Sequence, residues 1–198
     1  YYREAVFGLR KKPYIAVQNP THYGEFLIKT PWVISDAAAS WNWDGMEGKP
    51  AIVEVYAQGD EVELLLNGTS LGKKAAGKEA GFRTLFETTY EPGTLTAISY
   101  ENGHEIGRNE LATAGCERTL CVEKEEYVGL KNAKQELVYV QVEMRDQNGV
   151  LVADDNQKIT LSVDGEVEVL GFGSGNPKPN YNFNEGMTEL FGGRAQII

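Results

Sequence analysis

The chain has 198 residues, 41% of them hydrophobic and 24% charged, which is enough apolar material for one large or two small packed domains. Its formal net charge of −10 would repel a phosphate backbone, so nucleic acid is not expected as a partner. No run approaches the roughly 20 apolar residues that cross a bilayer, so a membrane is not expected either.

The N-terminal segment predicts a short amphipathic helix within residues 1–12. Tyr2, Val6 and Leu9 recur at spacings of three and four, charged residues lie between them, and Pro13 would end the helix. The sequence begins at Tyr1 rather than at a methionine and does not open with a charged-then-apolar leader, as we expect of a mature product or an excised segment.

After Pro13 the pattern changes to short runs of β-branched and aromatic residues separated by Gly and Asn, which is typical of strands. Residues 51–57 and 61–66 are two such runs, and residues 138–145 and 159–163 alternate more regularly. Three Asn-Gly pairs offer the positive φ angles of hairpin turns in antiparallel meanders: Asn67-Gly68, Asn102-Gly103 and Asn148-Gly149.

Many short strands without a later helix-length segment predict antiparallel β-sandwiches rather than a parallel α/β sheet. A stretch rich in Glu and Lys over residues 116–135 separates two sets of strands, so we place a boundary near Ala114-Gly115. The expected domains are residues 13–114 and 115–198. Cys116 and Cys121 match no metal or redox spacing, and we expect small, buried or half-buried side chains without a disulfide.

Several motifs have a plain structural interpretation. The glycine-rich segment 171–177 could suggest a phosphate loop, but it contains Pro177 and Pro179 follows, so a loop at a strand end is favoured. Asn67-Gly68-Thr69 is formally a glycosylation acceptor, but a type I′ turn is favoured because it explains both the Asn and the Gly. The two histidines, His22 and His104, have no clustered carboxylate or cysteine, so neither a metal nor a cofactor is expected.

The remaining candidates for a functional site are carboxylates, as catalytic groups, and tryptophans, as sugar-binding groups. The acidic residues are numerous, but most occupy the polar phase of strands or linkers, which favours solvated faces over a catalytic pair. Trp41 and Trp43 would share one side of a strand, where they could form a core, an interdomain contact or a sugar-stacking platform. Core or interdomain packing is favoured, and Trp32 and Tyr181 are the other candidate sugar or interdomain contacts.

A family resemblance rests on segments in a fixed order. They are Ala39-Ser40-Trp41-Asn42-Trp43-Asp44-Gly45, Glu47 to Pro50, Val53 to Tyr56, Val62 to Gly72, Tyr90 to Leu95 and Leu111 to Gly115, followed by Val138 to Asp146, Gly171 to Pro177 and Phe191 to Ala195. The sequence resembles the domains that follow the catalytic barrel of glycoside hydrolase family 2 β-galactosidases. The resemblance implies two tandem immunoglobulin-like β-sandwiches, with residues 1–12 similar to the last helix of a (β/α)8 barrel.

The same resemblance implies a parent enzyme that hydrolyses terminal β-galactosides, or related β-glycosides, with retention through two glutamates of its barrel. The family's acid/base follows an Asn, but Asn109-Glu110 and Asn184-Glu185 lie in the Ig-like part, so no catalytic residue is assigned. The family's last domain usually continues beyond a segment like residues 193–198, so the second sandwich is expected to lack an edge strand. Export to the periplasm or beyond the cell is expected of such enzymes.

Three functions therefore remain open. The leading expectation is a non-catalytic C-terminal region whose partner is the catalytic barrel of the same polypeptide, with a carbohydrate substrate bound by the parent enzyme. The alternative is an independent carbohydrate-binding or adhesive module that uses Trp32, Trp41 or Tyr181. The weakest is hydrolysis by the chain itself through Glu110 or Glu185. Parent enzymes that act on galactosides, glucuronides or mannosides can be told apart here only by family resemblance, and these domains resemble the galactosidase branch best.

Overall fold

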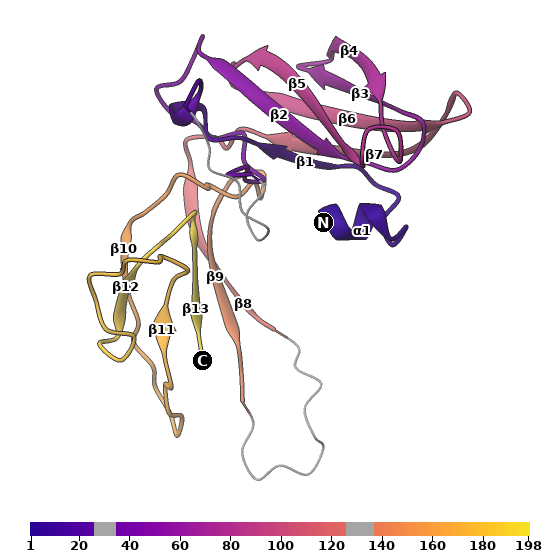
Figure 1. The fold of residues 1–198 in the computed structure, drawn as a ribbon. Coiled ribbons are helices and arrows are strands. Elements are labelled where there is room, and N and C mark those ends of the chain that lie inside the picture. Colours follow the sequence, from indigo (N-terminus) through magenta and orange to yellow (C-terminus); the bar gives the residue numbers. More distant parts are fainter. Residues whose placement is uncertain (26–34, 126–136) are drawn as a thin grey trace. The chain divides into compact units, whose positions relative to one another are not determined.

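The computed structural model describes residues 1–25, 35–125 and 137–198 (Figure 1). Apart from one short helix, α1 (Tyr2–Val6), and one 3-10 turn, η1 (Pro20–His22), the described elements are strands, and the strands pair antiparallel. Two compact units are present, Tyr1–Thr113 and Ala114–Ile198. The all-β fold predicted from the strand patterns is confirmed. No helix in the described part of the chain has the length and apolar character to cross a membrane.

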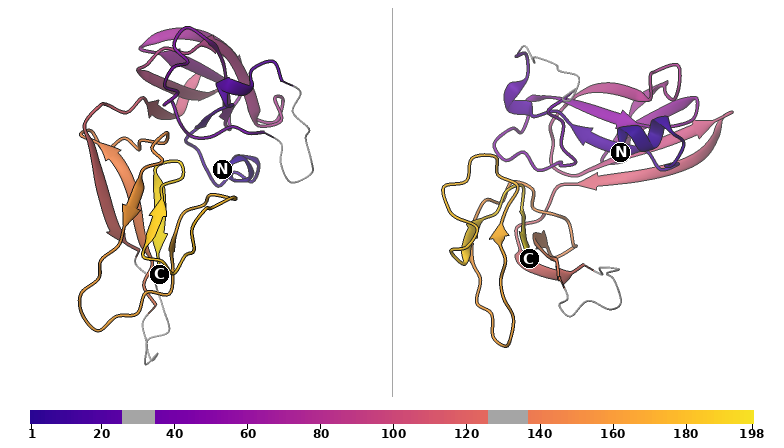
Figure 2. Two further views of the ribbon diagram at one scale, coloured as in Figure 1. Left: turned by 90° about the vertical axis from the view of Figure 1, so that its left-hand side faces the viewer. Right: turned by 60° about the horizontal axis from the view of Figure 1, so that its bottom comes forward.

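The N-terminal unit is built from two sheets that face each other (Figure 2). One sheet has the order β1-β2-β5 and the other the order β4-β3-β6-β7. The bounds are β1 (Tyr14–Val17), β2 (Pro50–Tyr56), β3 (Glu61–Leu66), β4 (Thr69–Ala75), β5 (Arg83–Thr89), β6 (Thr94–Glu101) and β7 (His104–Ala112).

The core of this unit comes from alternate residues of both sheets. Val53 and Val55 of β2 and Phe86 of β5 meet Leu64 of β3 and Leu95 of β6, and all five side chains are buried. The period-2 alternation that puts them on one face is the physical reason for the sandwich, because each sheet removes the apolar face of the other from water.

Two of the three Asn-Gly pairs form the expected hairpin turns. Asn67 and Gly68 join β3 to β4 with φ angles of 51° and 79°. Asn102 and Gly103 join β6 to β7 with φ angles of 51° and 78°. Positive φ at both central residues matches the twist of the flanking strands, so local sequence fixes these two connections.

The expected helix is shorter than its apolar pattern. It ends at Val6, and Gly8 has a φ of 72°, which is incompatible with a continuing helix. The prediction that Leu9 shares a packed helical face is wrong, because Leu9 is 78% exposed and Ala5 is the buried residue of the helix. The helix therefore ends next to Gly8, which has a left-handed backbone conformation, and not at Pro13 as we expected.

The C-terminal unit has a four-stranded sheet of order β11-β13-β9-β8 and a small sheet of β10 and β12. Val142 and Met144 of β9, Phe172 of β11 and Ala195 of β13 form its core together with Val152 and Leu190. The bounds are β8 (Arg118–Lys124), β9 (Val140–Asp146), β10 (Lys158–Thr160), β11 (Phe172–Gly173), β12 (Met187–Glu189) and β13 (Arg194–Ile197).

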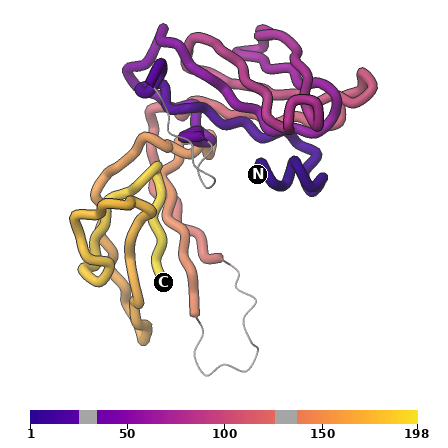
Figure 3. The backbone as a smooth tube through the Cα atoms, in the orientation of Figure 1, coloured from indigo at the N-terminus to yellow at the C-terminus, as the bar shows by residue number. Residues whose placement is uncertain are grey.

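The order of these strands differs from a simple meander. The backbone trace in Figure 3 follows the yellow C-terminal segment as it returns beside the orange segment that holds β9. Arg194 pairs with Glu143 and Ile197 with Val140, so β13 lies between β9 and β11. The expected strand at residues 159–163 is shorter, since β10 ends at Thr160 and Val163 is exposed.

The expectation for the cysteines is corrected in part. Cys116 is exposed, whereas Cys121 on β8 is half-buried, and both thiols are free. Cys116 lies before the start of β8 and is exposed, so it is not the small buried or half-buried residue that we expected.

The third Asn-Gly pair forms a turn without a second regular strand, which corrects the meander prediction. Asp146, at the end of β9, accepts hydrogen bonds from the backbone N–H groups of Asn148 and Val150, both at 2.8 Å, and of Gly115 at 2.7 Å. Beyond the turn only an isolated bridge joins Arg145 to Leu151. The edge of β9 that a hairpin partner would use is taken by β13.

Replacing Asp146 with alanine should lower the free energy of unfolding of the C-terminal unit by about 1–3 kcal/mol, because three amide donors lose their acceptor. The hydrogen bond from Gly115, though opposed by burial, is the main cause that lowers the pKa of Asp146, and Val150 and Asn148 add to it. Urea unfolding measures the loss. The matched control is Asp154→Ala at an exposed position nearby; equal losses for the two variants would contradict the role given to Asp146.

Candidate functional site

Trp41, the first aromatic candidate, is a core residue. It is fully buried, its Nε1 donates to the carbonyl of Glu91 at 2.9 Å, and its ring meets that of Tyr90 edge to face at 4.8 Å. It lies outside the strands, so the shared strand face expected for Trp41 and Trp43 is not formed. A sugar platform at Trp41 is excluded because no face of its indole reaches solvent.

The other two tryptophans, Trp43 and Trp32, do not supply a described sugar-stacking platform in place of Trp41. Trp43 is half-buried and packs against the same core, and its Nε1 donates to the carbonyl of Ser40 at 3.2 Å. Trp32 lies outside the described residues. The core interpretation of the tryptophan cluster therefore holds for Trp41 and, in part, for Trp43.

Tyr181 lies in the C-terminal unit and is half-buried. Its hydroxyl is 2.7 Å from the Ser174 hydroxyl and 3.4 Å from the carbonyl of Glu189. Ser174 belongs to the glycine-rich segment 171–177, in which Phe172 and Gly173 form β11 and residues 174–177 form the loop that follows it. Tyr181 thus holds this loop in place.

The same loop borders a cavity of about 610 Å³, which we call the β13 cavity. Outward-facing side chains of β9 and β13 supply polar groups, and Phe183, Leu170 and Ile198 supply apolar ones. The lining residues used below are Gln141, Glu143, Ser174, Phe183, Arg194 and Gln196. Sequence reasoning missed this site because residues 141–143 and 194–196 meet only through the pairing of β13 with β9.

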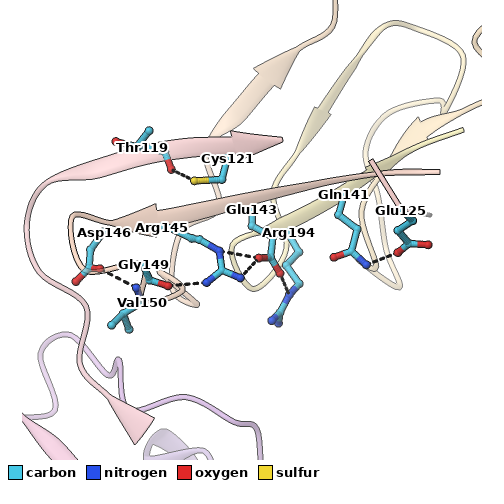
Figure 4. A network of polar contacts seen from close by, with 10 residues as sticks. All are labelled: Thr119, Cys121, Glu125, Gln141, Glu143, Arg145, Asp146, Gly149, Val150 and Arg194. Atoms are coloured by element: carbon cyan, nitrogen blue, oxygen red, sulfur yellow. Dashed lines mark hydrogen bonds and ion pairs between the residues drawn. The ribbon is translucent and has the colours of Figure 1, made fainter. Parts of the chain in front are cut away.

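A charged cluster, drawn in Figure 4, includes two residues that line the β13 cavity, Glu143 and Arg194. Glu143 accepts from Arg194 Nε at 2.8 Å and from Nε and Nη2 of Arg145, the first at 2.9 Å. Burial acts to raise the pKa of Glu143, but the hydrogen bonds from Arg194 and Arg145 outweigh it and leave the pKa below its ordinary value. Glu143 is therefore ionised at neutral pH and is held by two guanidinium groups.

The N-terminal unit has a buried carboxylate of its own. Glu54 on β2 is fully buried and accepts from Arg83 at 2.7 and 2.6 Å, Gln18 at 2.7 Å, Ser35 at 2.6 Å and Tyr56 at 2.9 Å. Burial would raise the pKa of Glu54, yet these hydrogen bonds, that from Arg83 first, lower it to about 2. The expectation that the acidic residues form solvated faces is wrong for Glu54 and Glu143.

His22 has a carboxylate neighbour that its sequence context did not reveal. Its Nδ1 is 3.0 Å from Asp36 Oδ2, beside a hollow of about 390 Å³. Within the described ranges no three His, Cys, Asp or Glu side chains gather as metal ligands would. The pair is partly exposed, and we assign it no chemistry.

The two Asn-Glu pairs lie on exposed segments of separate units. Glu110 lies exposed on β7 of the N-terminal unit, 3.4 Å from the Thr96 hydroxyl. Glu185 is exposed in a turn of the C-terminal unit, where its amide donates to the carbonyl of Asn182. The two glutamates belong to different units.

Two family descriptions match separate parts of the chain. Residues 48–107 match a family described as "Domain of unknown function (DUF4982)". Residues 124–198 match "Glycoside hydrolase family 2 C-terminal domain 5". The two matches fall in the two units one after the other.

Similar proteins point the same way. The β-galactosidase BoGH2A of Bacteroides ovatus is 28% identical over 80% of this chain and 18% of its own length. A Formosa agariphila protein with the provisional name of a β-glucuronidase is 32% identical over 74% of this chain and 14% of its own length. The chain thus spans less than a fifth of the length of these two relatives.

A solved structure extends the match to the fold. A glycosyl hydrolase family 2 member from Bacteroides cellulosilyticus is 29% identical, with a TM-score of 0.82, over 100% of this chain and 26% of its own. A β-glucuronidase of the same family, at 16% identity and a TM-score of 0.71, shares the fold. From its sequence matches and its fold, the chain belongs to glycoside hydrolase family 2, of which it represents the C-terminal region.

Proposed function

We propose that the chain is a non-catalytic part of a longer retaining β-glycosidase, whose partner is the catalytic barrel of the same polypeptide. The observation that carries the proposal is the match of residues 124–198 to a C-terminal domain of glycoside hydrolase family 2, in a chain that spans less than a fifth of the length of its two curated relatives. A retaining mechanism needs a pair of carboxyl groups about 5 to 5.5 Å apart across one sugar, and we place that pair in the barrel. The role left to the two β-units is to support the barrel and to flank its substrate cleft.

The proposed division of the chain follows from this role. Residues 1–12 would be the end of the barrel, residues 13–114 the first Ig-like sandwich and residues 115–198 the second. In support, Gln58 donates to the carbonyl of Ala5 at 2.6 Å, so helix α1 is attached to the first sandwich. A barrel helix fixed in this way would hold the sandwich against the barrel.

The proposed substrate of the parent enzyme is a terminal β-galactoside. The β-galactosidase of Bacteroides ovatus supports it, while the Formosa agariphila relative supports a β-glucuronide as the second candidate. Assays of the protein encoded by the whole gene on an aryl β-galactoside and on the matching aryl β-glucuronide separate the two.

The 198-residue chain alone is expected to show no turnover of either aryl glycoside, whereas the whole-gene protein turns over one of them. Glu110→Gln and Glu185→Gln in the whole-gene protein should leave the rate unchanged, because neither carboxylate faces a substrate in this proposal. Turnover by the isolated chain that is lost in either variant would overturn the proposal. An upstream coding sequence with only further Ig-like domains would also overturn it.

A further inference from the structure

We propose that the β13 cavity binds an acidic saccharide, with the sugar carboxylate on Arg194 and the sugar ring against Phe183. The site belongs wholly to the C-terminal unit and needs no residue of a barrel. This inference goes beyond the proposed function, and its outcome does not depend on whether a parent enzyme exists.

The charge of the cluster favours an anionic group. Within the cluster of Glu143, Arg145 and Arg194, one carboxylate faces two guanidinium groups, and the Glu125 carboxylate accepts a hydrogen bond from Gln141 of the same cavity. Both oxygens of Glu143 are already occupied: Oε1 by Arg194 and Oε2 by Arg145. Arg145 also donates through Nη1 to the carbonyl of Gly149 at 2.5 Å, so its fork is used within the protein.

Arg194 keeps free donors. Its side chain is 59% exposed, and within the described part of the chain only its Nε has a partner, Glu143. The two Nη groups form the end of the planar fork, the edge that binds a carboxylate through two parallel hydrogen bonds. Glu143 fixes the orientation of this edge, so less side-chain entropy is lost when a ligand binds.

Phe183 gives the cavity an aromatic wall. Its ring lies directly over Gly173, where an added Cβ would come within 2.2 Å of Phe183 Cδ1. The backbone of Phe183 is held beside β11, because its carbonyl accepts the N–H of Phe172 at 2.8 Å. The side chain is half exposed, and its apolar face suits the C–H face of a pyranose ring.

Neutral polar groups complete the site. Gln196 on β13 is exposed and lies opposite Gln141 on β9, and its side-chain amide has no hydrogen-bond partner among the residues that the structure describes. An amide offers both donors and an acceptor, as sugar hydroxyl groups require. Ser174, whose hydroxyl is 2.7 Å from that of Tyr181, also lines the cavity. A cavity of about 610 Å³ is within the usual size of small-ligand sites.

The test compares two ligands that differ only in the carboxylate, methyl β-D-glucuronide and methyl β-D-glucoside, by calorimetric titration of the 198-residue chain. We expect the glucuronide to bind at least about tenfold more tightly, since a hydrogen bond to a charged group contributes that much. Arg194→Gln should remove this tenfold preference, and Phe183→Ala should weaken both ligands. Arg108→Gln is the matched control, because Arg108 is also exposed and pairs with Glu105 at 2.9 Å outside the cavity.

Several outcomes would overturn the proposal. They are equal binding of the two ligands, no heat from either at millimolar concentration, or an unchanged preference in Arg194→Gln. Binding of acetate as tight as that of the glucuronide would show a site for a simple anion and would overturn the saccharide. If Arg194→Gln changes the unfolding curve, Arg194→Lys keeps the charge without the fork, and it should still lose most of the preference.

Discussion

Replacing Glu54 with alanine is expected to lower the free energy of unfolding of the N-terminal unit by about 3–5 kcal/mol, the cost of breaking a buried ion pair. The carboxylate is fully buried, and the side chain of Arg83 that binds both its oxygens is only 20% exposed. Without Glu54 the guanidinium stays largely out of water with no counter-charge. The donors of Gln18 and Tyr56 lose their acceptor as well.

Urea unfolding followed by tryptophan emission measures this loss, because the three tryptophans of the sequence fall in residues 1–113. The matched control is Glu87→Ala on the neighbouring strand β5, where the glutamate is exposed. A loss no larger for Glu54 than for Glu87 would contradict the central role of the buried carboxylate.

The Glu54 carboxylate also makes the stability of the N-terminal unit depend on pH. The folded pKa of Glu54, about 2, lies below its ordinary value of 4.5, so the folded state favours the ionised form. This contribution to stability is complete above about pH 4.5 and is lost as the pH falls toward 2. In Glu54→Gln, the urea midpoint of unfolding should fall less steeply between pH 4.5 and pH 2 than in the unchanged chain, because the variant lacks this carboxylate.

Trp41→Ala is expected to cost the N-terminal unit about 3–5 kcal/mol, because truncating a buried large side chain leaves a cavity in a packed core. The edge-to-face contact with Tyr90 and the hydrogen bond to the carbonyl of Glu91 are lost with it. Urea unfolding followed by circular dichroism measures the change. Trp43→Ala is the control, with a smaller expected loss since Trp43 is only half-buried. Equal losses would contradict the assignment of Trp41 to the centre of the core.

Local sequence was sufficient where a connection is local. Asn67-Gly68 and Asn102-Gly103 carry both the positive φ angles and flanking strands, so the two hairpins follow from a few neighbouring residues. Asn148-Gly149 has the same residues and a different outcome. There the side chain of Asp146 takes the turn amides, and β13 takes the edge of β9.

Long-range features could not be predicted in this way. A carboxylate in a strand pattern looks solvated unless its partner is known, and Arg83 is 29 residues from Glu54 while Arg194 is 51 from Glu143. Both partners arrive through strand pairing, β5 beside β2 and β13 beside β9. For the same reason the β13 cavity had no signal in the sequence, although the candidate Tyr181 does contact Ser174 of the loop that borders it.

The position of β13 also governs when the C-terminal unit can assemble. The β8 and β9 strands can pair early, but the sheet is continuous only after residues 194–197 enter between β9 and β11. About 50 residues of chain must close into a loop before this pairing gains any free energy, and such non-local contacts slow folding. During synthesis, the N-terminal unit can therefore complete its core while the C-terminal unit still exposes an unpaired edge that chaperones or aggregation can reach.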